Sequence, residues 1–368
     1  RIPGIVPLGA ASPSPQLFPT RRMRRVLSGV FQRLGDEVNV YDVAPGREEF
    51  RKLIAQRAIE KGARLRPDDI IATCGCLEAL HLSLRAVSKP GDMVAVENPT
   101  YFGILQVLET LGLRAVEIPT DPRTGMDLDA FRKALRTRKL AAAVVMPNFH
   151  NPLGSKMPDA HKKELVSLAA TRNLPLIEDD IYGDLYYTGP RPRTLKSYDT
   201  EGLVILCSSF SKLLSPGLRV GWCAPGRYRN EVERLKMMST IGTGTIPQLL
   251  ITEMLRGGGY DRFLRGLRNS FYTQTQKTIA AIGKYFPEGT RVTKPQGGFV
   301  LWVELPRGID SVELARKALQ KNISVAPGIL FSPKGSFRNF LRISCGQIWT
   351  ETIDRALLTL GLLSRGIA

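Results

Sequence analysis

One loop combines a lysine, several serines and an arginine in a way that suggests chemistry. It is LCSSFSKLLSPGLRVGW, residues 206–222, which lies between two apolar runs. Lys212 follows Ser209 and Ser211, and Arg219 stands seven residues further along. Burial lowers the pKa of a lysine so that its free amine can attack a carbonyl carbon, while serine hydroxyls and a bidentate arginine bind a phosphate group. The loop therefore indicates a reactive lysine beside an anion site, although most single lysines in loops are solvated surface residues.

Other polar residues also come directly after apolar runs that are typical of strands. Gly75 and Cys76 follow the run IIAT and open a helix, whose first backbone amides can hold a phosphate group. Asp179 and Tyr182 follow the run LPLIE, and Asn151 follows the run AVVMP. Taken singly, these residues also suit structural roles in turns and helix caps. Their common position favours function, because ligands of open α/β sheets bind at the carboxyl ends of the strands.

A single ligand would use all of these groups together. It would carry a phosphate for the helix start and Arg219, an aldehyde for Lys212, and a ring nitrogen for Asp179. A carboxylate beside that nitrogen keeps it protonated and makes the ring an electron sink. These requirements describe pyridoxal 5′-phosphate. We expect no metal site, because Cys74 and Cys76 have no second Cys or His pair at zinc spacing.

The elements that must position these residues alternate along the chain from about residue 68 to residue 225. Continuous apolar runs of strand length alternate with amphipathic helical stretches, which is typical of an α/β fold with a mostly parallel sheet covered on both faces. Seven strands are expected, at residues 68–75, 92–99, 114–119, 140–147, 174–180, 202–210 and 218–225. Helices are expected between them at residues 77–87, 102–112, 127–137 and 157–173.

The pattern changes after about residue 230. A long basic helix is expected over residues 258–286, and the shorter strands and helices that follow it suggest a smaller α+β domain. We therefore divide the chain into three parts. These are an N-terminal segment (residues 1–50) that contacts the small domain or a partner subunit, a large cofactor-binding domain (residues 51–265) and a small C-terminal α+β domain (residues 266–368).

Composition is that of an ordinary globular protein. Of the 368 residues, 43% are hydrophobic and 23% are charged, and no apolar run is long enough to span a membrane. Five scattered cysteines favour a reducing cytoplasm over a disulfide framework. The net charge of +18 would attract anionic ligands or nucleic acid, but its densest cluster, residues 21–25, also suits the solvated face of a helix.

Several motifs, in order along nearly the whole chain, together resemble one family. They are YDVAPGREEFRKLIA, TCGCLEAL, VENPTYFG, MPNFHNPLG, IEDDIYGDL, SSFSKLLSPGLRVGW, KPQGGFVLW and NFLRISCG. This series is similar to that of the fold type I, pyridoxal phosphate-dependent aminotransferases of class I/II. The resemblance is greatest to the aminotransferase-like domain of MocR-type regulators in the GntR superfamily. It implies the fold type I architecture and a homodimer whose sites are each built from two subunits.

The resemblance also implies a role for each residue that matches a motif. Lys212 would form a Schiff base with the cofactor and move the substrate proton, and Asp179, rather than Asp180, would pair with the ring nitrogen. Tyr182 and Asn151 would contact the phenolic oxygen, Tyr101 would stack on the ring, and Arg342 would bind the substrate α-carboxylate together with Asn151. The remaining cofactor contacts would come from Gly75, Cys76, Leu77, Ser209, Ser211, Arg219 and, from the partner subunit, Tyr41.

Leu77 departs from the family pattern. Relatives often have a glutamine there, whose side chain supports the phosphate. Leucine keeps the backbone amide and loses that side-chain contact, so we expect the phosphate to be bound by a poorer anchor.

Two functions from different classes fit these residues. The first is an aminotransferase that moves an amino group between an amino acid and a 2-oxo acid. The second is the effector domain of a MocR-type transcriptional regulator, which senses pyridoxal phosphate or an amino compound and would contact DNA only through a preceding winged-helix domain. The first residue, Arg1, and the segment of residues 5–30 fit such a fragment, and free aminotransferases of the same subfamily begin similarly. A lyase or decarboxylase is a third reading, which Arg342 disfavours because it would restrain the carboxylate that has to leave.

Overall fold

A computed structural model gives the structure of the protein and describes residues 3–366. Within that range the main sheet has eight strands in the order β2-β9-β8-β7-β6-β3-β4-β5. Strands β8, β7, β6, β3 and β4 are parallel, and β9 is antiparallel to both of its neighbours. The strands are β2 (Ile71–Thr73), β3 (Met93–Asn98), β4 (Arg114–Asp121), β5 (Gly125–Met126), β6 (Leu140–Val145), β7 (Leu176–Asp179), β8 (Val204–Ser209) and β9 (Gly221–Ala224).

The seven expected strands are all present in the main sheet, and this sheet contains one more. The additional strand is β5, which has two residues and pairs antiparallel with the end of β4 through Thr120 and Met126. The prediction of a seven-stranded sheet was therefore short by one edge strand. A two-residue strand carries too little periodicity to be recognised in a sequence.

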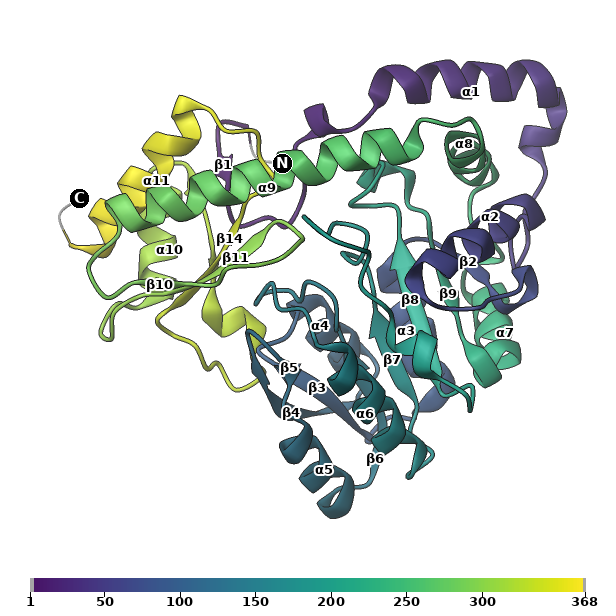
Figure 1. The fold of residues 1–368 in the computed structure, drawn as a ribbon, viewed down its shortest axis with the longest axis horizontal. Coiled ribbons are helices and arrows are strands. Elements are labelled where there is room, and N and C mark those ends of the chain that lie inside the picture. The colour runs from purple at the N-terminus through teal and green to yellow at the C-terminus, as the bar shows by residue number, and fades with distance from the viewer. Residues whose placement is uncertain (1–2, 367–368) are drawn as a thin grey trace.

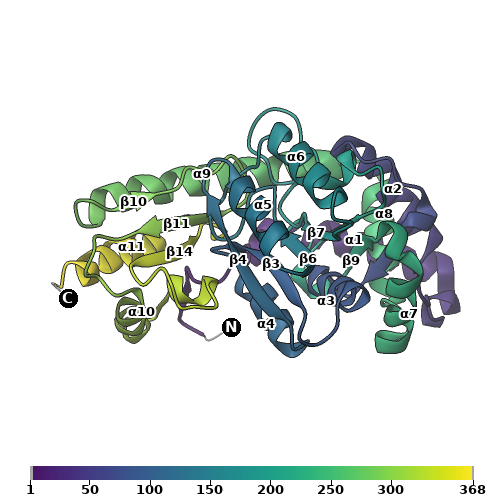
Figure 2. The same cartoon turned by 90° about the horizontal axis from the view of Figure 1, so that it is seen from below.

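Helices cover both faces of this sheet because successive side chains of a buried strand point in opposite directions. Val94 and Val96 of β3 pack in the cluster formed with α3 and α4, whereas Ala95 between them packs with α5 and α6. Figure 2 shows these two pairs of helices on opposite sides of the strands. The helices are α3 (Cys76–Val87), α4 (Phe102–Thr110), α5 (Leu128–Thr137) and α6 (Asp159–Ala170).

A second, smaller unit is built around an antiparallel sheet in the order β10-β11-β14-β13. Near it, β1 pairs in parallel with β12, so the start of the described chain joins this unit. Figure 1 shows the unit beside the main sheet. Its elements are β1 (Val6–Pro7), β10 (Arg291–Val292), β11 (Val300–Glu304), α10 (Ser311–Gln320), β12 (Ile323–Ser324), β13 (Ala326–Pro327), β14 (Phe340–Ser344) and α11 (Glu351–Ser364).

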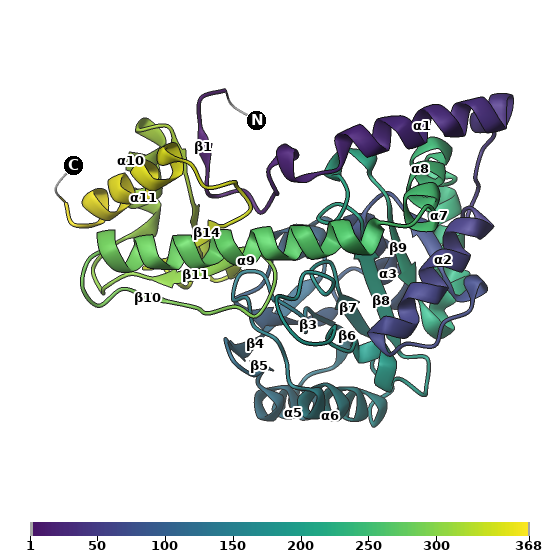
Figure 3. The same ribbon diagram turned by 45° about the horizontal axis from the view of Figure 1, so that its top comes forward.

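One long helix, α9 (Tyr260–Tyr285), links the two units and runs along the length of the molecule (Figures 1 and 3). The expected boundary after residue 265 falls inside this helix, and the three-part division of the chain stays a prediction. The remaining helices are α1 (Thr20–Leu34), α2 (Glu48–Ala58), α7 (Arg229–Thr240) and α8 (Thr245–Arg256). None of the helices in the described part of the chain is long and apolar enough to cross a membrane.

The packing of α11 on α9 depends on a glycine. A Cβ atom on Gly361 would overlap the carbonyl oxygen of Tyr285, so the two helices approach more closely there than any other residue permits. The hydrogen bond of 2.9 Å from Tyr285 Oη to Asp354 Oδ2 fixes the same contact from the other side. This contact holds α11 against the C-terminal end of the linking helix.

We expect Gly361→Ala to lower the free energy of unfolding by about 2 kcal/mol, because the new methyl group must push the two helices apart. Gly266→Ala is the matched control, since it lies inside α9 with open space around its Cβ position. It should raise stability by roughly 0.5–1 kcal/mol through helix propensity. Urea unfolding measures both changes. The same sign for both variants would contradict this description of the contact.

Candidate active site

The predicted site residues gather around one cavity of about 380 Å³ at the carboxyl ends of β6, β7 and β8. The predicted residues that line it are Cys76, Leu77, Tyr101, Asn151, Asp179, Tyr182, Ser209, Ser211, Lys212, Arg219 and Arg342. Gly75 immediately precedes Cys76 at the start of α3. Tyr41 is 78% exposed and lies at a different hollow of the chain, beside Thr245. Its contact with the site of a partner subunit stays a prediction.

Lys212 lies in the loop after β8, with its amine in the cavity. Nζ donates a hydrogen bond of 2.6 Å to the carbonyl oxygen of Ala11 in the N-terminal segment. Burial lowers the pKa of Lys212 to about 8, the cations of Arg342 and Arg219 add to this shift, and Asp179 opposes it. A substantial fraction of the amine is therefore neutral near pH 7–8, which is the form that attacks a carbonyl carbon.

Asp179 ends β7 and opens on the same cavity. Burial raises its pKa to about 6. Hydrogen bonds from the Cys76 thiol, at 3.4 Å, and from the Ile181 backbone amide, at 3.1 Å, favour the carboxylate form and limit that rise. Asp179 is thus a buried carboxylate that ionises just below neutral pH and faces an open space.

Asp180, the next residue, is held away from the cavity by buried cations. It is paired with Arg191, lies 3.5 Å from Lys61 Nζ, and accepts a hydrogen bond of 3.0 Å from Asn148 Nδ2. Asp184 joins the same cluster through Lys61 at 3.3 Å and Arg191 at 3.1 Å. Burial alone would raise the pKa of Asp184, but the two cations outweigh burial and hold it well below its usual range. Of the two adjacent aspartates, only Asp179 has a carboxylate available to a ligand.

The start of α3 forms a cradle with the end of the lysine loop. Gly75 has φ = +88°, and a Cβ atom there would come within 2.6 Å of Arg219 Nη2. Arg219, itself left-handed at φ = +51°, donates a hydrogen bond of 3.0 Å to the carbonyl oxygen of Cys74. Its guanidinium group therefore lies directly against the helix start. Free backbone amides, hydroxyl groups and a guanidinium group converge here, as an anion requires.

Arg342, on β14, is the most deeply buried cation of the cavity, with 2% of its surface exposed. It donates a hydrogen bond of 3.1 Å to Asn151 Oδ1 and another to the carbonyl oxygen of Gly9. Within residues 3–366 its Nε has no acceptor and no carboxylate pairs with it. Burial lowers its pKa. A buried guanidinium with only neutral partners is stabilised by an anion, so the geometry suits an anionic group such as a carboxylate.

The two tyrosines form walls of the cavity. Tyr101 immediately precedes α4 and lies 5.0 Å, between ring centroids, from Phe102. Tyr182 is buried edge-on against Phe299 at 5.4 Å. Burial raises the pKa of both hydroxyl groups, so both remain protonated and can donate a hydrogen bond.

Sequence reasoning missed two contacts made by unremarkable residues. The carbonyl groups of Gly9 and Ala11 accept hydrogen bonds from Arg342 and Lys212, although small residues in a loop give no signal of such contacts. Sequence reasoning also assigned no contact to the thiol of Cys76, which donates a hydrogen bond to Asp179. The only available hint was that residues 9–12 belong to the N-terminal segment, which was expected to contact the small domain or a partner subunit.

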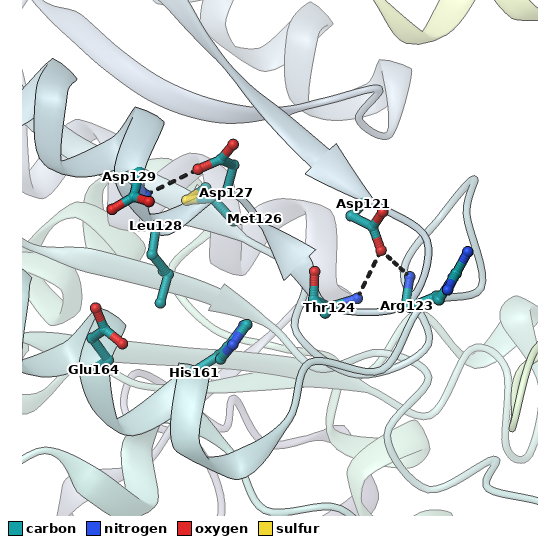
Figure 4. Close-up of a pocket in the computed structure, with 9 residues that line it drawn as sticks. All are labelled: Asp121, Arg123, Thr124, Met126, Asp127, Leu128, Asp129, His161 and Glu164. Carbon is teal, nitrogen blue, oxygen red and sulfur yellow. Dashed lines mark hydrogen bonds between the residues drawn. The ribbon is translucent and has the colours of Figure 1, made fainter.

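A second hollow, of about 600 Å³, lies at the turn before α5 and beside α6 (Figure 4). Its carboxylates are already engaged. Asp121 accepts hydrogen bonds from the amides of its own turn, and Asp127 caps α5. Asp129 and Glu164 both pair with Arg132. We therefore assign no chemistry to this hollow.

Comparison with known proteins identifies one family. The profile described as "Aminotransferase class I and II" matches residues 17–360. An uncharacterized HTH-type transcriptional regulator of Escherichia coli K12, YjiR, is 41% identical over 359 residues, which cover 97% of this chain and 76% of that protein.

Solved structures resemble the whole chain. The α-aminoadipate aminotransferase LysN of Thermus thermophilus, complexed with N-(5′-phosphopyridoxyl)-L-leucine, is 29% identical with a TM-score of 0.93, over 100% of this chain and 93% of that one. The kynurenine aminotransferase of Pyrococcus horikoshii is 28% identical with a TM-score of 0.93, over 99% of this chain and 92% of that one.

The buried cluster behind the cavity makes a prediction about stability. Arg191→Met removes one of the two cations that Asp180 and Asp184 share and leaves only Lys61, and breaking a buried pair costs about 3–5 kcal/mol. The pKa of Asp184 is lowered in the folded state, so its contribution is present above its unfolded pKa, about 4, and is lost as pH falls through the folded pKa. The difference between wild type and variant should therefore shrink as the pH falls from 6 to 3.

Urea unfolding at several pH values measures this difference. The control is Arg316→Met, which breaks an exposed pair with Glu313 and should change stability at no pH. A difference between wild type and Arg191→Met that does not depend on pH would contradict the assignment of Asp184.

Proposed function

The chain belongs to the class I and II aminotransferase family, and we propose that it moves an amino group between an amino acid and a 2-oxo acid with pyridoxal 5′-phosphate bound in the cavity. The family and the fold type I architecture expected from the motifs are confirmed by the family match and by the similarity to solved aminotransferases. The observation that carries the proposal is the convergence of Lys212, Asp179 and Arg342 on one cavity.

The residues of the cavity fit the cofactor at each of its functional groups. The amine of Lys212, with a pKa of about 8, would hold the aldehyde covalently. The carboxylate of Asp179 would accept a hydrogen bond from the ring nitrogen. The absence of a Cβ atom on Gly75 lets the Arg219 guanidinium lie against the start of α3, where it would hold the phosphate together with the helix amides.

The other cavity residues would complete the binding of the cofactor. Tyr101 would stack on the ring, and Tyr182 and Asn151 would contact its phenolic oxygen. The phosphate would be bound by the backbone amides of Cys76 and Leu77 and by the side chains of Ser209, Ser211 and Arg219.

When bound, pyridoxal phosphate supplies an electron sink that stabilises negative charge on the substrate carbon attached to the amino group. Asp179 would keep the ring nitrogen protonated, because an ionised carboxylate favours a positive charge beside it. Lys212 Nζ would take the proton from the substrate α-carbon and would later deliver it to the cofactor. A pKa of about 8 suits this exchange, since a group that titrates near the working pH both accepts and releases protons readily.

Arg342 would orient the substrate. Its planar guanidinium group matches a carboxylate with two parallel hydrogen bonds, and Asn151 already fixes Nη1 at 3.1 Å. A carboxylate bound in this way stays in place while the neighbouring carbon exchanges its proton. The same restraint disfavours loss of that carboxylate as carbon dioxide.

A homodimer in a reducing cytoplasm is part of the proposal, with Tyr41 of each subunit reaching the phosphate of the other. The surface around Tyr41 supports this assembly. Val40, Met237, Met238 and Ile241 are exposed apolar residues, and an isolated bridge between Val43 and Gly242 brings their two segments together. Exposed apolar groups that gather in this way are characteristic of an interface.

A second candidate function is the effector domain of a MocR-type transcriptional regulator. It is favoured by the 41% identity to a protein named as an HTH-type regulator, of which this chain matches 76%. In such a protein the same cavity would bind pyridoxal phosphate or an amino compound without sustained turnover, and DNA would be contacted by a separate domain. Turnover, rather than cofactor binding, separates the two candidates.

Borohydride treatment of protein loaded with pyridoxal phosphate should fix the cofactor on Lys212, which peptide mass spectrometry can locate. The rate at which added pyridoxal phosphate attaches to Lys212 of the cofactor-free protein should rise with pH, with a midpoint near 8, because only the neutral amine reacts. Lys212→Ala should yield no adduct at this position and no visible absorption band of a bound cofactor. The same reducible adduct in Lys212→Ala would refute the assignment.

A screen of amino acids against the loaded protein tests the transfer itself. In single-turnover spectroscopy at least one donor should convert the bound cofactor to its amine form, and 2-oxoglutarate added afterwards as acceptor should restore the aldehyde form. Arg342→Met should raise the donor concentration needed for half-maximal conversion much more than it raises Kd for pyridoxal phosphate. The reason is that Arg342 is assigned to the substrate. Conversion by no donor, in a protein that binds the cofactor normally, would refute turnover and leave the regulator.

The cradle predicts a specific effect on cofactor affinity. Gly75→Ala should weaken pyridoxal phosphate binding at least tenfold, about 1.4 kcal/mol, because the new Cβ lies 2.6 Å from the present position of Arg219 Nη2. Gly91→Ala is the control: its φ of +90° is almost the same, and its Cβ position is open. It should share the backbone strain and leave affinity unchanged in a titration followed by tryptophan fluorescence. Equal loss in both variants would mean that strain, and not the cradle, is responsible.

A further inference from the structure

The two oxygens of the Asp179 carboxylate have different surroundings. Oδ1 accepts both of its hydrogen bonds, from the Ile181 amide at 3.1 Å and from the Cys76 thiol at 3.4 Å. Within residues 3–366, Oδ2 accepts none, and it is not among the buried polar atoms that lack a partner. Because the rest of Asp179 is buried and the residue lines the cavity, Oδ2 is the oxygen that opens into it.

Cys76 is placed to control which oxygen takes this position. It is the first residue of α3 and is 5% exposed, so its side chain cannot turn away into solvent. The Ile181 amide lies two residues from Asp179 and follows any local movement of that loop. Cys76 comes from another element, 103 residues away, and is a reference point independent of the Asp179 loop.

The thiol remains a donor over the whole working pH range. Burial raises its pKa well above the usual value, and the charge of Asp179 raises it further. A protonated thiol beside a carboxylate can only donate, so the direction of this hydrogen bond is fixed.

We propose that Cys76 is a positioning residue that acts through Asp179: its thiol holds Oδ1 and thereby points Oδ2 at the ring nitrogen of the cofactor. The inference rests on the proposed function and adds a side-chain role to a residue whose backbone amide would bind the phosphate. Cys76 would thus act at both ends of the cofactor: its backbone amide would bind the phosphate, and its thiol would orient the carboxylate that faces the ring nitrogen. The neighbouring Asp180 cannot replace Asp179, because Arg191 and Lys61 hold it elsewhere.

A double-mutant cycle on cofactor affinity tests this role. The variants are Cys76→Ala, Asp179→Asn and the combination of both, titrated with pyridoxal phosphate at pH 7. Cys76→Ala should raise Kd roughly threefold to tenfold, as expected for loss of a hydrogen bond from a weak donor to a charged acceptor. In the Asp179→Asn background the same substitution should change Kd by less than about twofold, because the partner is already altered.

Two further variants separate positioning from packing. Cys76→Ser keeps a donor of similar size and should retain wild-type affinity to within about twofold. Cys223→Ala removes another fully buried thiol, from β9, that makes no contact with Asp179, and should leave Kd unchanged. If Cys76→Ala weakened binding equally in both Asp179 backgrounds, or if Cys76→Ser failed to rescue it, the proposal would be overturned.

An infrared titration tests the contact without the cofactor. The carboxylic acid band of Asp179 is identified as the one that Asp179→Asn abolishes, and its midpoint should lie near the pKa of about 6 in the wild type. Loss of a donor to the anion raises a carboxyl pKa, so the midpoint should move upward in Cys76→Ala and stay in place in Cys76→Ser. An unchanged midpoint in Cys76→Ala would overturn the inference. A shifted midpoint in a protein that does not bind pyridoxal phosphate would instead refute the proposed function alone.

Discussion

The burial of three ionisable side chains around one cavity is the constraint on which the rest of the structure depends. Asp179 and Arg342 are buried and Lys212 is largely shielded from bulk water, and none of them is neutralised by a direct ion pair with another. Desolvation disfavours the charged form of each group, which is why the lysine pKa falls to about 8 and the aspartate pKa rises to about 6. A ligand with groups of complementary charge would offset this cost of desolvation.

The chain maintains this arrangement by satisfying neighbouring charges elsewhere. Asp180 is as buried as Asp179, and Asp184 is partly buried, but Arg191 and Lys61 pair with both of them behind the cavity. That cluster gives both carboxylates cationic partners of their own. The carbonyl groups of Gly9 and Ala11 provide neutral acceptors for Arg342 and Lys212, so that neither cation is left without a hydrogen bond. Neutral acceptors leave both cations available to a stronger, charged ligand.

The fold determines how these groups meet. The parallel strands β6, β7 and β8 end at the same edge of the sheet, which brings together residues that follow each of them. Arg342 arrives from the small unit on β14, and residues 9–12 arrive from the N-terminal segment. The linking helix α9 spans both units. How the two units are placed therefore determines where Arg342 lies relative to Lys212.

The sequence by itself determined the elements and the kinds of residue in the site. Apolar runs and helical periodicity located the strands and helices because these signals are local, and the position of Lys212, Asp179 and Gly75 after strands placed them at one edge. The two-residue strand β5 was missed because it is too short to carry a pattern.

Only the tertiary structure decided which groups are free to act. Asp179 and Asp180 are adjacent in sequence, and what separates them is the partners that each meets: Cys76 for the first, Arg191 and Lys61 for the second. The partner of Lys212 lies 201 residues away, at Ala11. Hydrogen bonds and desolvation depend on distances in space, and residues so far apart in the chain give no sign in the sequence that they will touch.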